Sequence, residues 1–293
     1  MRAGSTATGR WFCTGATRTP LLSSAIERWH RTEPESPLLP ESGLHAAFGG
    51  KGGAGKSVIA ATVARLLARR GRRVLALDSD TLPGLALSLG AVVPELPPLL
   101  EAAERGEDGR WRLRKGIGPV RAVRGYATEA PDGVRLLQAG KSGTQGLTPV
   151  MGAVNAFHAV VHRLDAADGF ADWDIIGDLP GGPRQLAFDW APYASRFVLV
   201  VEPTSQSMLT GRRILRLVSA RRSTSTALVV NKVAGRKDVE RVESFFGTPA
   251  LGTIPASEDV RRAEAIGAAL LDFSPSSPAV EAIEALVERL LAR

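Results

Sequence analysis

The sequence predicts an α/β fold in which a doubly wound, mainly parallel sheet carries helices on both faces. Apolar runs typical of buried strands alternate along the chain with amphipathic stretches of helical spacing, and this alternation favours a parallel sheet. A glycine-rich loop joins the first of these strands to the first helix. The chain has 293 residues, of which 44% are hydrophobic and 23% charged, and this is enough for one large domain with its own core.

The first predicted strand is the apolar run LHAAF at 44–48, which leads into five glycines between positions 49 and 55. The next stretch, SVIAATVARLLARRG, places apolar residues at helical spacing from Ile59 to Leu67, and Gly71 is a plausible end of that helix. Strand, glycine loop and helix follow one another in the order that a phosphate-binding loop requires. Glycines let backbone N–H groups turn inward around an anion, and the helix N-terminus adds its dipole.

Positions 50–57 fit the pattern G-x-x-x-x-G-K-[ST]. The pattern predicts that Lys56 contacts the β- and γ-phosphates of a bound nucleotide and that Ser57 contacts Mg²⁺. The predicted cradle consists of Gly50, Gly52, Gly53, Ala54, Gly55, Lys56, Ser57 and Val58.

A second lysine, Lys51, lies in the same loop, where it would repel Lys56 in the absence of a ligand. This arrangement is understandable if Lys51 reaches a phosphate bound elsewhere. The run KGGAGKS resembles the deviant Walker A pattern, K-G-G-x-G-K-[ST], of the MinD/ParA/ArsA and nitrogenase-iron-protein group of ATPases. In that group the signature lysine crosses a dimer interface onto the partner's nucleotide. The resemblance covers about residues 44–293, and it implies an ATP-binding and ATP-hydrolysing homodimeric switch in which Lys51 acts across the interface.

Two carboxylates, Asp78 and Asp80, follow the predicted strand 74–77, at the edge where open α/β sheets bind ligands. A carboxylate there can orient the attacking water or support Mg²⁺. The stretch resembles switch I of the same family, and the resemblance implies that Asp80 positions the water and that Asp78 lies near the metal. The family pattern is D-x-D-P followed by N-L. This sequence departs from it, because Thr81 and Leu82 separate Asp80 from Pro83 and because Gly84 stands where the asparagine is expected.

The stretch WDIIGDLPGG at 173–182 repeats this arrangement, since an apolar strand ends at Asp178 and two glycines follow. A carboxylate here can hold a Mg²⁺-bound water, and a glycine N–H can approach the γ-phosphate without a side chain intervening. The stretch resembles the Walker B and switch II elements of the family, with Asp178 and Gly182 in the matching positions.

Three more strands are predicted, at 196–204, 226–233 and 249–255. The second of them contains NKV, which resembles the adenine-reading element of the family. The resemblance implies that Asn231 offers its amide to the base and that the region of Pro255 packs on the adenine. An asparagine that merely ends a strand in a turn is the alternative for Asn231.

Two segments, VVEPTSQSMLTGRRI at 200–214 and IPASEDVRRAEAIGAAL at 254–270, resemble the CooC-type branch of the family. Members of that branch are accessory ATPases for nickel insertion into carbon monoxide dehydrogenase. Those proteins hold metal with a Cys-x-Cys motif, whereas the only cysteine here is Cys13, outside the region of resemblance. We therefore expect an accessory role for an unidentified client protein without a thiolate metal site. His158 and His162 are spaced for one helical face and could hold a metal, but a surface or packing role is the alternative.

A positioning or partition ATPase that binds non-specific DNA is the other functional class. The segment 109–125 holds six cations and no acid, and Arg110, Arg112 and Arg114 alternate with apolar residues. The alternation suggests a strand with one basic face, which could contact phosphates or could simply be a solvated edge. Arg212, Arg213 and Arg216 add a basic helix to the same prediction.

Residues 1–43 are rich in Ser, Thr, Gly, Arg and Pro without periodicity, which predicts a poorly ordered extension before an ATPase domain at 44–293. No apolar run approaches the ~20 residues that a membrane span needs. Binding to a membrane surface is not expected either, because three glutamates in the amphipathic segment 279–293 oppose contact with anionic lipid. We therefore expect a soluble, cytoplasmic protein.

Overall fold

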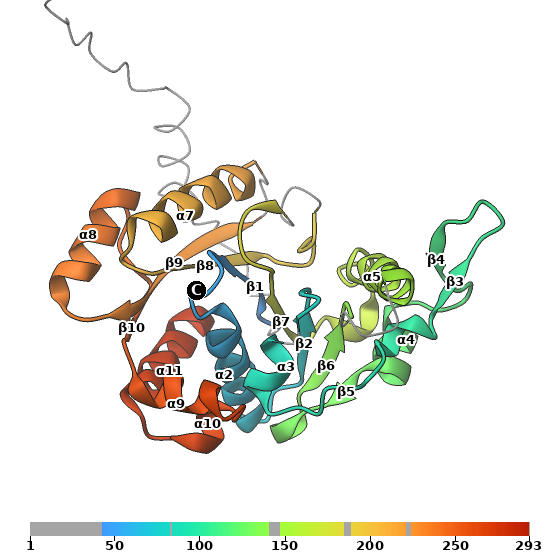
Figure 1. The fold of residues 1–293 in the computed structure, drawn as a ribbon, viewed down its shortest axis with the longest axis horizontal. Coiled ribbons are helices and arrows are strands. Elements are labelled where there is room, and N and C mark those ends of the chain that lie inside the picture. Colours follow the sequence, from blue (N-terminus) through green and yellow to red (C-terminus); the bar gives the residue numbers. More distant parts are fainter. Residues whose placement is uncertain (1–42, 83, 141–146, 185–188, 221–223, 293) are drawn as a thin grey trace, which may run out of the picture.

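An eight-stranded sheet forms the centre of the computed structural model, which describes residues 43–82, 84–140, 147–184, 189–220 and 224–292 (Figure 1). The strand order is β10-β9-β8-β1-β7-β2-β6-β5. All neighbouring strands are parallel except β5, which is antiparallel to β6. The predicted fold class is thus confirmed. The strands are β1 His45–Gly50, β2 Val74–Asp78, β5 Thr128–Glu129, β6 Arg135–Gln138, β7 Asp174–Asp178, β8 Arg196–Val201, β9 Ser225–Val233 and β10 Gly252–Pro255.

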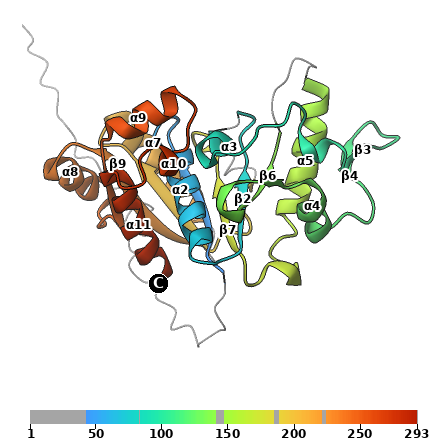
Figure 2. The same ribbon diagram turned by 90° about the horizontal axis from the view of Figure 1, so that it is seen from below.

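Helices cover both faces of the sheet, so the central strands have no solvent-exposed face and their sequences are almost continuously apolar. Each face of the sheet has its own hydrophobic core. In β2, Ala76 belongs to the core on one face, and Leu75 and Leu77 belong to the core on the other face. The first layer contains α2 Lys56–Arg69, α3 Gly84–Leu89, α10 Leu270–Phe273 and α11 Pro278–Leu291. The second contains α4 Pro119–Tyr126, α5 Leu147–Val161, α7 Ser205–Val218 and α8 Arg236–Phe246. Figure 2 shows α9, Glu258–Ala265, beside α10.

A two-stranded hairpin, β3 Ala103–Arg105 and β4 Trp111–Leu113, projects from the body of the molecule beside α4 and α5 (Figures 1 and 2). Its inner face is apolar, and Trp111 packs so closely on α5 that a Cβ at Gly152 would lie 3.0 Å from the indole ring. A strand is thus present where the alternation of cations and apolar residues predicts one, and in it Arg112 is exposed between the half-buried Trp111 and Leu113. The second half of the segment 109–125 is the helix α4, which begins with Pro119 at a position where proline needs no N–H.

The C-terminal ends of β1, β2, β6 and β7 meet at one edge of the sheet, because these strands are parallel neighbours. The register pairs Phe48 with Asp178, Asp178 with Asp78, and Asp78 with Gln138. Polar residues that are 40 to 100 positions apart in the chain are thereby brought into one row. Short 3-10 helices connect the outer elements: η1 Pro98–Leu100, η2 Pro131–Gly133 and η3 Asp168–Phe170.

None of the helices in the described part of the chain is long and apolar enough to cross a membrane. The predicted N-terminal extension lies outside the described residues except for its last residue, Gly43.

Candidate functional site

The glycine loop connects the end of β1 at Gly50 with the start of α2 at Lys56, so β1 extends two residues beyond the predicted strand. Two glycines of the loop have left-handed backbone angles, with φ of 79° at Gly53 and 89° at Gly55. These angles let the loop wrap tightly in front of the helix N-terminus. A Cβ at Gly55 would also lie only 2.2 Å from the side-chain amide nitrogen of Asn231, which leaves no room for another residue.

The two lysines of the loop lie in different environments. Lys56 is buried, and its ammonium group donates to the carbonyl oxygen of Lys51 at 3.4 Å. The same carbonyl accepts the N–H of Ala54 at 3.1 Å. The side chain of Lys51 is half-buried and forms no ion pair with another residue of the described chain. Lys56 is thus held inside the loop, whereas the charge of Lys51 is not neutralised there.

Asp178 ends β7 directly behind the first turn of α2. Its Oδ2 accepts the hydroxyl of Ser57 at 2.5 Å, while its Oδ1 is buried without a hydrogen-bond partner among the described residues. Burial raises the pKa of Asp178 to about 6, against the opposing effects of the Ser57 hydrogen bond and the Lys56 charge. A buried carboxylate oxygen without a partner, next to a serine hydroxyl, is a donor set suited to Mg²⁺.

Asp78 and Asp80 lie at the end of the neighbouring strand β2. Asp78 is buried beside Asp178, and burial together with the charge of Asp178 raises the pKa of Asp78 well above its ordinary value. Its Oδ1 accepts the N–H of Asp80 at 3.1 Å, and Asp80 in turn accepts the N–H of Leu82 at 3.2 Å. The two carboxylates therefore shape the turn that leads into α3, and Asp80 is the more exposed of the two.

Gln138, at the end of β6, is a site residue that sequence reasoning missed. It is the register neighbour of Asp78, it is buried, and its Nε2 has no hydrogen-bond partner within the described chain. Ser79 is also buried, and its hydroxyl has no hydrogen-bond partner within the described chain. The signal in the sequence is the one that identified Asp78 and Asp178, a polar residue after an apolar run, but the strand VRLLQ was not predicted.

The two glycines after β7 lie against the phosphate loop. A Cβ at Gly181 would come within 2.8 Å of the backbone of Gly52, so only glycine fits. Gly182 has a left-handed φ of 94°, and its N–H donates to the carbonyl oxygen of Gly50 at 2.9 Å. The N–H expected to face a phosphate is thus bonded to the loop here, and contact with a phosphate requires that bond to open.

Two consecutive residues at the end of β9 hold two consecutive carbonyls of the phosphate loop. The side-chain amide of Asn231 donates to Ala54 O at 2.8 Å, and the ammonium group of Lys232 donates to Gly53 O at 2.7 Å. Lys232 also pairs with Glu202 at 2.7 Å. Sequence reasoning assigned Asn231 to the base and did not foresee this contact with the loop. Pro255 is half-buried at the end of the adjacent strand β10.

The predicted histidine pair is close together but is engaged in packing. The rings of His158 and His162 are 4.1 Å apart, His158 meets the edge of Trp190, and His162 Nε2 contacts the carbonyl of Asp189 at 2.8 Å. His162 also lies one residue beyond α5. Among the described residues, no group of three or more His, Cys, Asp or Glu side chains is arranged to hold a metal ion.

The basic hairpin carries less free charge than its sequence indicates. Arg112 pairs with Asp108 at 2.6 Å and lies opposite Glu104 in the register. Arg110 and Lys115 are exposed and form no ion pair with another described residue. On α7, Arg212 lies over the ring of Phe245 at 5.0 Å.

Taken together, the loop amides, Lys56 and the Ser57–Asp178 pair can bind the phosphates and the metal of a Mg²⁺-nucleotide at the carboxyl edge of the sheet. The family model for CobQ/CobB/MinD/ParA nucleotide-binding domains matches residues 45–270.

Individual relatives show the same likeness. An uncharacterised ATP-binding protein of Methanocaldococcus jannaschii is 26% identical over 250 residues, which is 84% of this chain and 86% of the relative. The carbon monoxide dehydrogenase accessory protein CooC of Rhodospirillum rubrum is 28% identical over 265 residues, covering 84% and 97%. The septum site-determining protein MinD of Pyrococcus horikoshii, solved as its complex with Mg-ADP, superimposes with a TM-score of 0.59 at 19% identity, covering 83% and 93%. At this identity the MinD structure supports the fold alone.

Proposed function

Because the chain belongs to the CobQ/CobB/MinD/ParA nucleotide-binding family, we propose that it is an ATP-hydrolysing switch protein that dimerises with nucleotide and acts as an accessory protein for a client. The observation that carries the proposal is that the two lysines of one loop lie in different environments. Lys56 is buried and held inside the loop, whereas the charge of Lys51 has no partner in the described chain. A second protomer with its own nucleotide offers such a partner.

In the proposed mechanism, the loop amides and Lys56 hold the β- and γ-phosphates. Ser57 and Asp178 would hold Mg²⁺, which would neutralise phosphate charge, and Asp78, the register neighbour of Asp178, would support the metal. Asp80 orients the attacking water from the turn after β2. Lys51 supplies positive charge to the nucleotide of the second protomer. Hydrolysis removes the γ-phosphate and allows the dimer to separate.

The accessory role is supported by the likeness to CooC, whose name assigns it to carbon monoxide dehydrogenase. The likeness does not extend to a thiolate metal site, because the only cysteine of this chain is Cys13. We therefore propose an accessory ATPase whose client is recognised without metal held by paired cysteines.

Three single substitutions test the nucleotide switch by phosphate release and by light scattering with ATP. Lys51→Ala should bind ATP but fail to dimerise, and it should lose most hydrolysis because charge supplied in trans is worth about 10³-fold or more in phosphoryl transfer. Asp80→Ala should dimerise with ATP and remain trapped, since its water is no longer oriented. Lys56→Ala should fail at binding. A Lys51→Ala protein that dimerises and hydrolyses normally would refute the role of Lys51.

Binding of non-specific DNA is a second candidate function, favoured by Arg110 and Lys115 of the hairpin region, which are exposed and form no ion pair within the part of the chain that the structure describes. The test is retardation of a random duplex at increasing salt, with Arg110→Glu as the variant. Counter-ion release makes such binding steeply salt-dependent. The absence of retardation at low salt would remove this candidate.

A further inference from the structure

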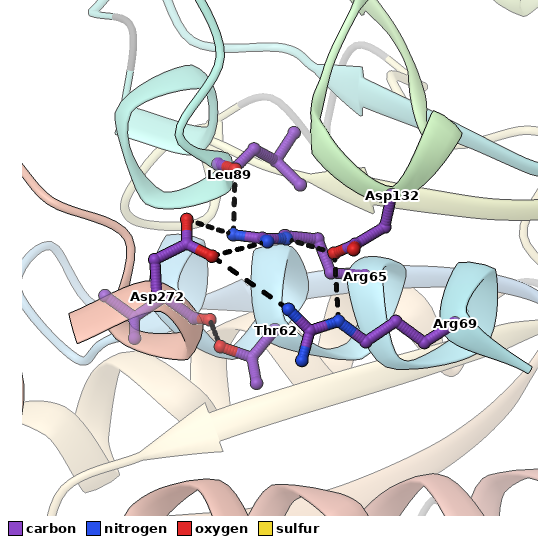
Figure 3. A network of polar contacts seen from close by, with 7 residues as sticks. Thr62, Arg65, Arg69, Leu89, Asp132 and Asp272 are labelled. Atoms are coloured by element: carbon purple, nitrogen blue, oxygen red, sulfur yellow. Dashed lines mark hydrogen bonds and ion pairs between the residues drawn. The ribbon is translucent and has the colours of Figure 1, made fainter. Parts of the chain in front are cut away.

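Arg65 is a charged side chain in the third turn of α2, a helix whose buried residues are apolar except for Lys56, Thr62 and Arg65 itself. It is only 2% exposed. A buried guanidinium group is costly unless acceptors surround it with good geometry. Here the acceptors come from three segments that are far apart in the sequence (Figure 3).

The contacts of Arg65 join α2 to η2, α10 and α3. Nε donates to Asp132 Oδ2 at 2.6 Å, in η2. Nη1 and Nη2 donate to both carboxylate oxygens of Asp272, in α10, at 2.6 and 2.7 Å. Nη1 also reaches the carbonyl of Leu89, the last residue of α3, at 3.4 Å. Arg69, one turn later on α2, adds an ion pair with Asp132 at 3.1 Å.

The turn after α3 fits into the same cluster. Gly90 has a left-handed φ of 75°, and a Cβ there would lie 3.3 Å from Asp272 Oδ2 and 3.6 Å from a ring carbon of Pro131. The C-terminal end of α3 is therefore wedged between η2 and α10, with its last carbonyl directed at Arg65.

The other end of α3 lies beside the phosphate loop. A Cβ at Gly84, the first residue of α3, would lie 3.1 Å from the hydroxyl of Ser57. This helix of six residues thus touches α2 at both ends, at Ser57 near the nucleotide site and at Arg65 away from it. The turn with Asp80 follows the buried end of β2, and the carbonyl of Leu82 in that turn accepts the N–H of Gly84 at 2.7 Å, so the position of the turn depends on where α3 is held.

We infer that Arg65 is a positioning residue for Asp80, because it anchors the far end of the helix on which the Asp80 turn depends. The inference rests on the proposed function, in which Asp80 orients the attacking water. With both ends of α3 fixed against α2, the turn after β2 is confined to one arrangement relative to Ser57 and Asp178. Without the anchor α3 can tilt, and a displacement of about 1 Å at a reacting group is enough to slow catalysis strongly.

The experiment compares Arg65→Lys and Asp272→Asn with wild-type protein. Arg65→Lys keeps the charge but loses the planar fork that binds both oxygens of Asp272. Asp272→Asn is the milder second variant, since the side chain of Asp272 is 50% exposed and Asp132 remains as a partner of Arg65. Arg70→Met is the matched control, because Arg70 follows the last residue of α2 and the substitution removes only an exposed ion pair with Glu288.

We expect both variants to lower kcat for ATP hydrolysis at least fivefold and to leave KM for ATP within twofold, since Lys56 and the loop are untouched. Amide hydrogen exchange of residues 84–90 should become at least fivefold faster in the nucleotide-free protein. Arg70→Met should change neither.

A lower unfolding midpoint with unchanged kcat and unchanged exchange in α3 would show that Arg65 only stabilises the fold, and the inference would be wrong. Wild-type protein that hydrolyses no ATP would overturn the proposed function instead. In that case the exchange of α3 in the nucleotide-free variants still decides whether Arg65 anchors this helix.

Discussion

Replacing Asp178 by asparagine should make the metal-free protein more stable at neutral pH. Asp178 is 3% exposed, and one of its carboxylate oxygens has no hydrogen-bond partner among the described residues. Burial is the largest cause that raises its pKa to about 6 from the ordinary 3.8. Asparagine has nearly the same shape, carries no charge, and offers an oxygen that can still accept the hydroxyl of Ser57.

The magnitude follows from the two pKa values. A difference of about 2 between 6 and 3.8 corresponds to roughly 3 kcal/mol, at about 1.4 kcal/mol for each pH unit. Because the pKa is higher in the folded state, the unfolded chain loses its proton first as the pH rises. This group therefore lowers the free energy of unfolding progressively between about pH 4 and pH 6, and the full penalty is present above pH 6. Below about pH 4 both states are protonated and Asp178 contributes nothing.

The assay is urea denaturation in EDTA without nucleotide, at pH 7.5 and at pH 4. Asp178→Asn should raise the free energy of unfolding by roughly 3 kcal/mol at pH 7.5 and by much less at pH 4. Addition of Mg²⁺-ATP should stabilise the wild-type protein and have a smaller effect on the variant, because a metal ligand is missing.

Asp174→Asn is the matched control on the same strand. Asp174 is also buried, but its oxygens accept Arg72 at 2.5 and 2.7 Å and the N–H of Leu44 at 2.6 Å. Replacing this buried carboxylate by a neutral amide weakens its charge-assisted hydrogen bonds and should destabilise the protein by about 1.5–3 kcal/mol. If Asp178→Asn destabilises the protein at pH 7.5, or if its gain is the same at both pH values, the reasoning about Asp178 is refuted.

Two further predictions concern the support of the phosphate loop. Lys232→Met should weaken ATP binding roughly tenfold, because a charge-assisted hydrogen bond to Gly53 is lost at a half-exposed site. The control Lys237→Met, on α8, should leave ATP binding unchanged. Titration with a fluorescent ATP analogue measures the affinity, and equal affinities for wild type and Lys232→Met would contradict this prediction. Gly55→Ala should destabilise the protein by about 1–2 kcal/mol or more and abolish ATP binding, because Gly55 has a φ of 89° and a Cβ there would clash with Asn231. The control Gly125→Ala, inside α4, should stabilise the protein by about 0.5–1 kcal/mol. A Gly55→Ala protein that unfolds at the wild-type urea concentration would show that the loop adapts.

Features that depend on local pattern could be predicted from the amino-acid sequence. Apolar runs and helical periodicity predicted the parallel sheet and its helices, and the glycine run with Lys56 and Ser57 located the phosphate loop. Asp78 and Asp178 were recognisable because each ends an apolar strand. In a parallel sheet, strand ends collect at one edge, so this local signal also carries information about the site.

Local pattern was a weaker guide where packing decides the outcome. The alternation around Trp111 predicts a strand with one basic face, and β4 is that strand, but its pairing with β3 in a separate hairpin is not visible in the local pattern. Gln138 was missed because the short strand β6 was not predicted, although its neighbour in the sheet is Asp78. The histidine pair has metal-binding spacing, yet its two rings pack against each other and His158 meets Trp190 edge-on.

The residues that support the site from a distance could be identified from the tertiary structure but not from the sequence. Arg65 meets Asp132 and Asp272 across 67 and 207 positions of the chain, and no local pattern specifies such partners. Gly177, the residue before Asp178 in β7, is a second case, because the hydroxyl of Tyr193 occupies the place where a Cβ at Gly177 would lie. Contacts between segments distant in sequence depend on how the helices pack on the sheet, and that packing is a property of the whole fold.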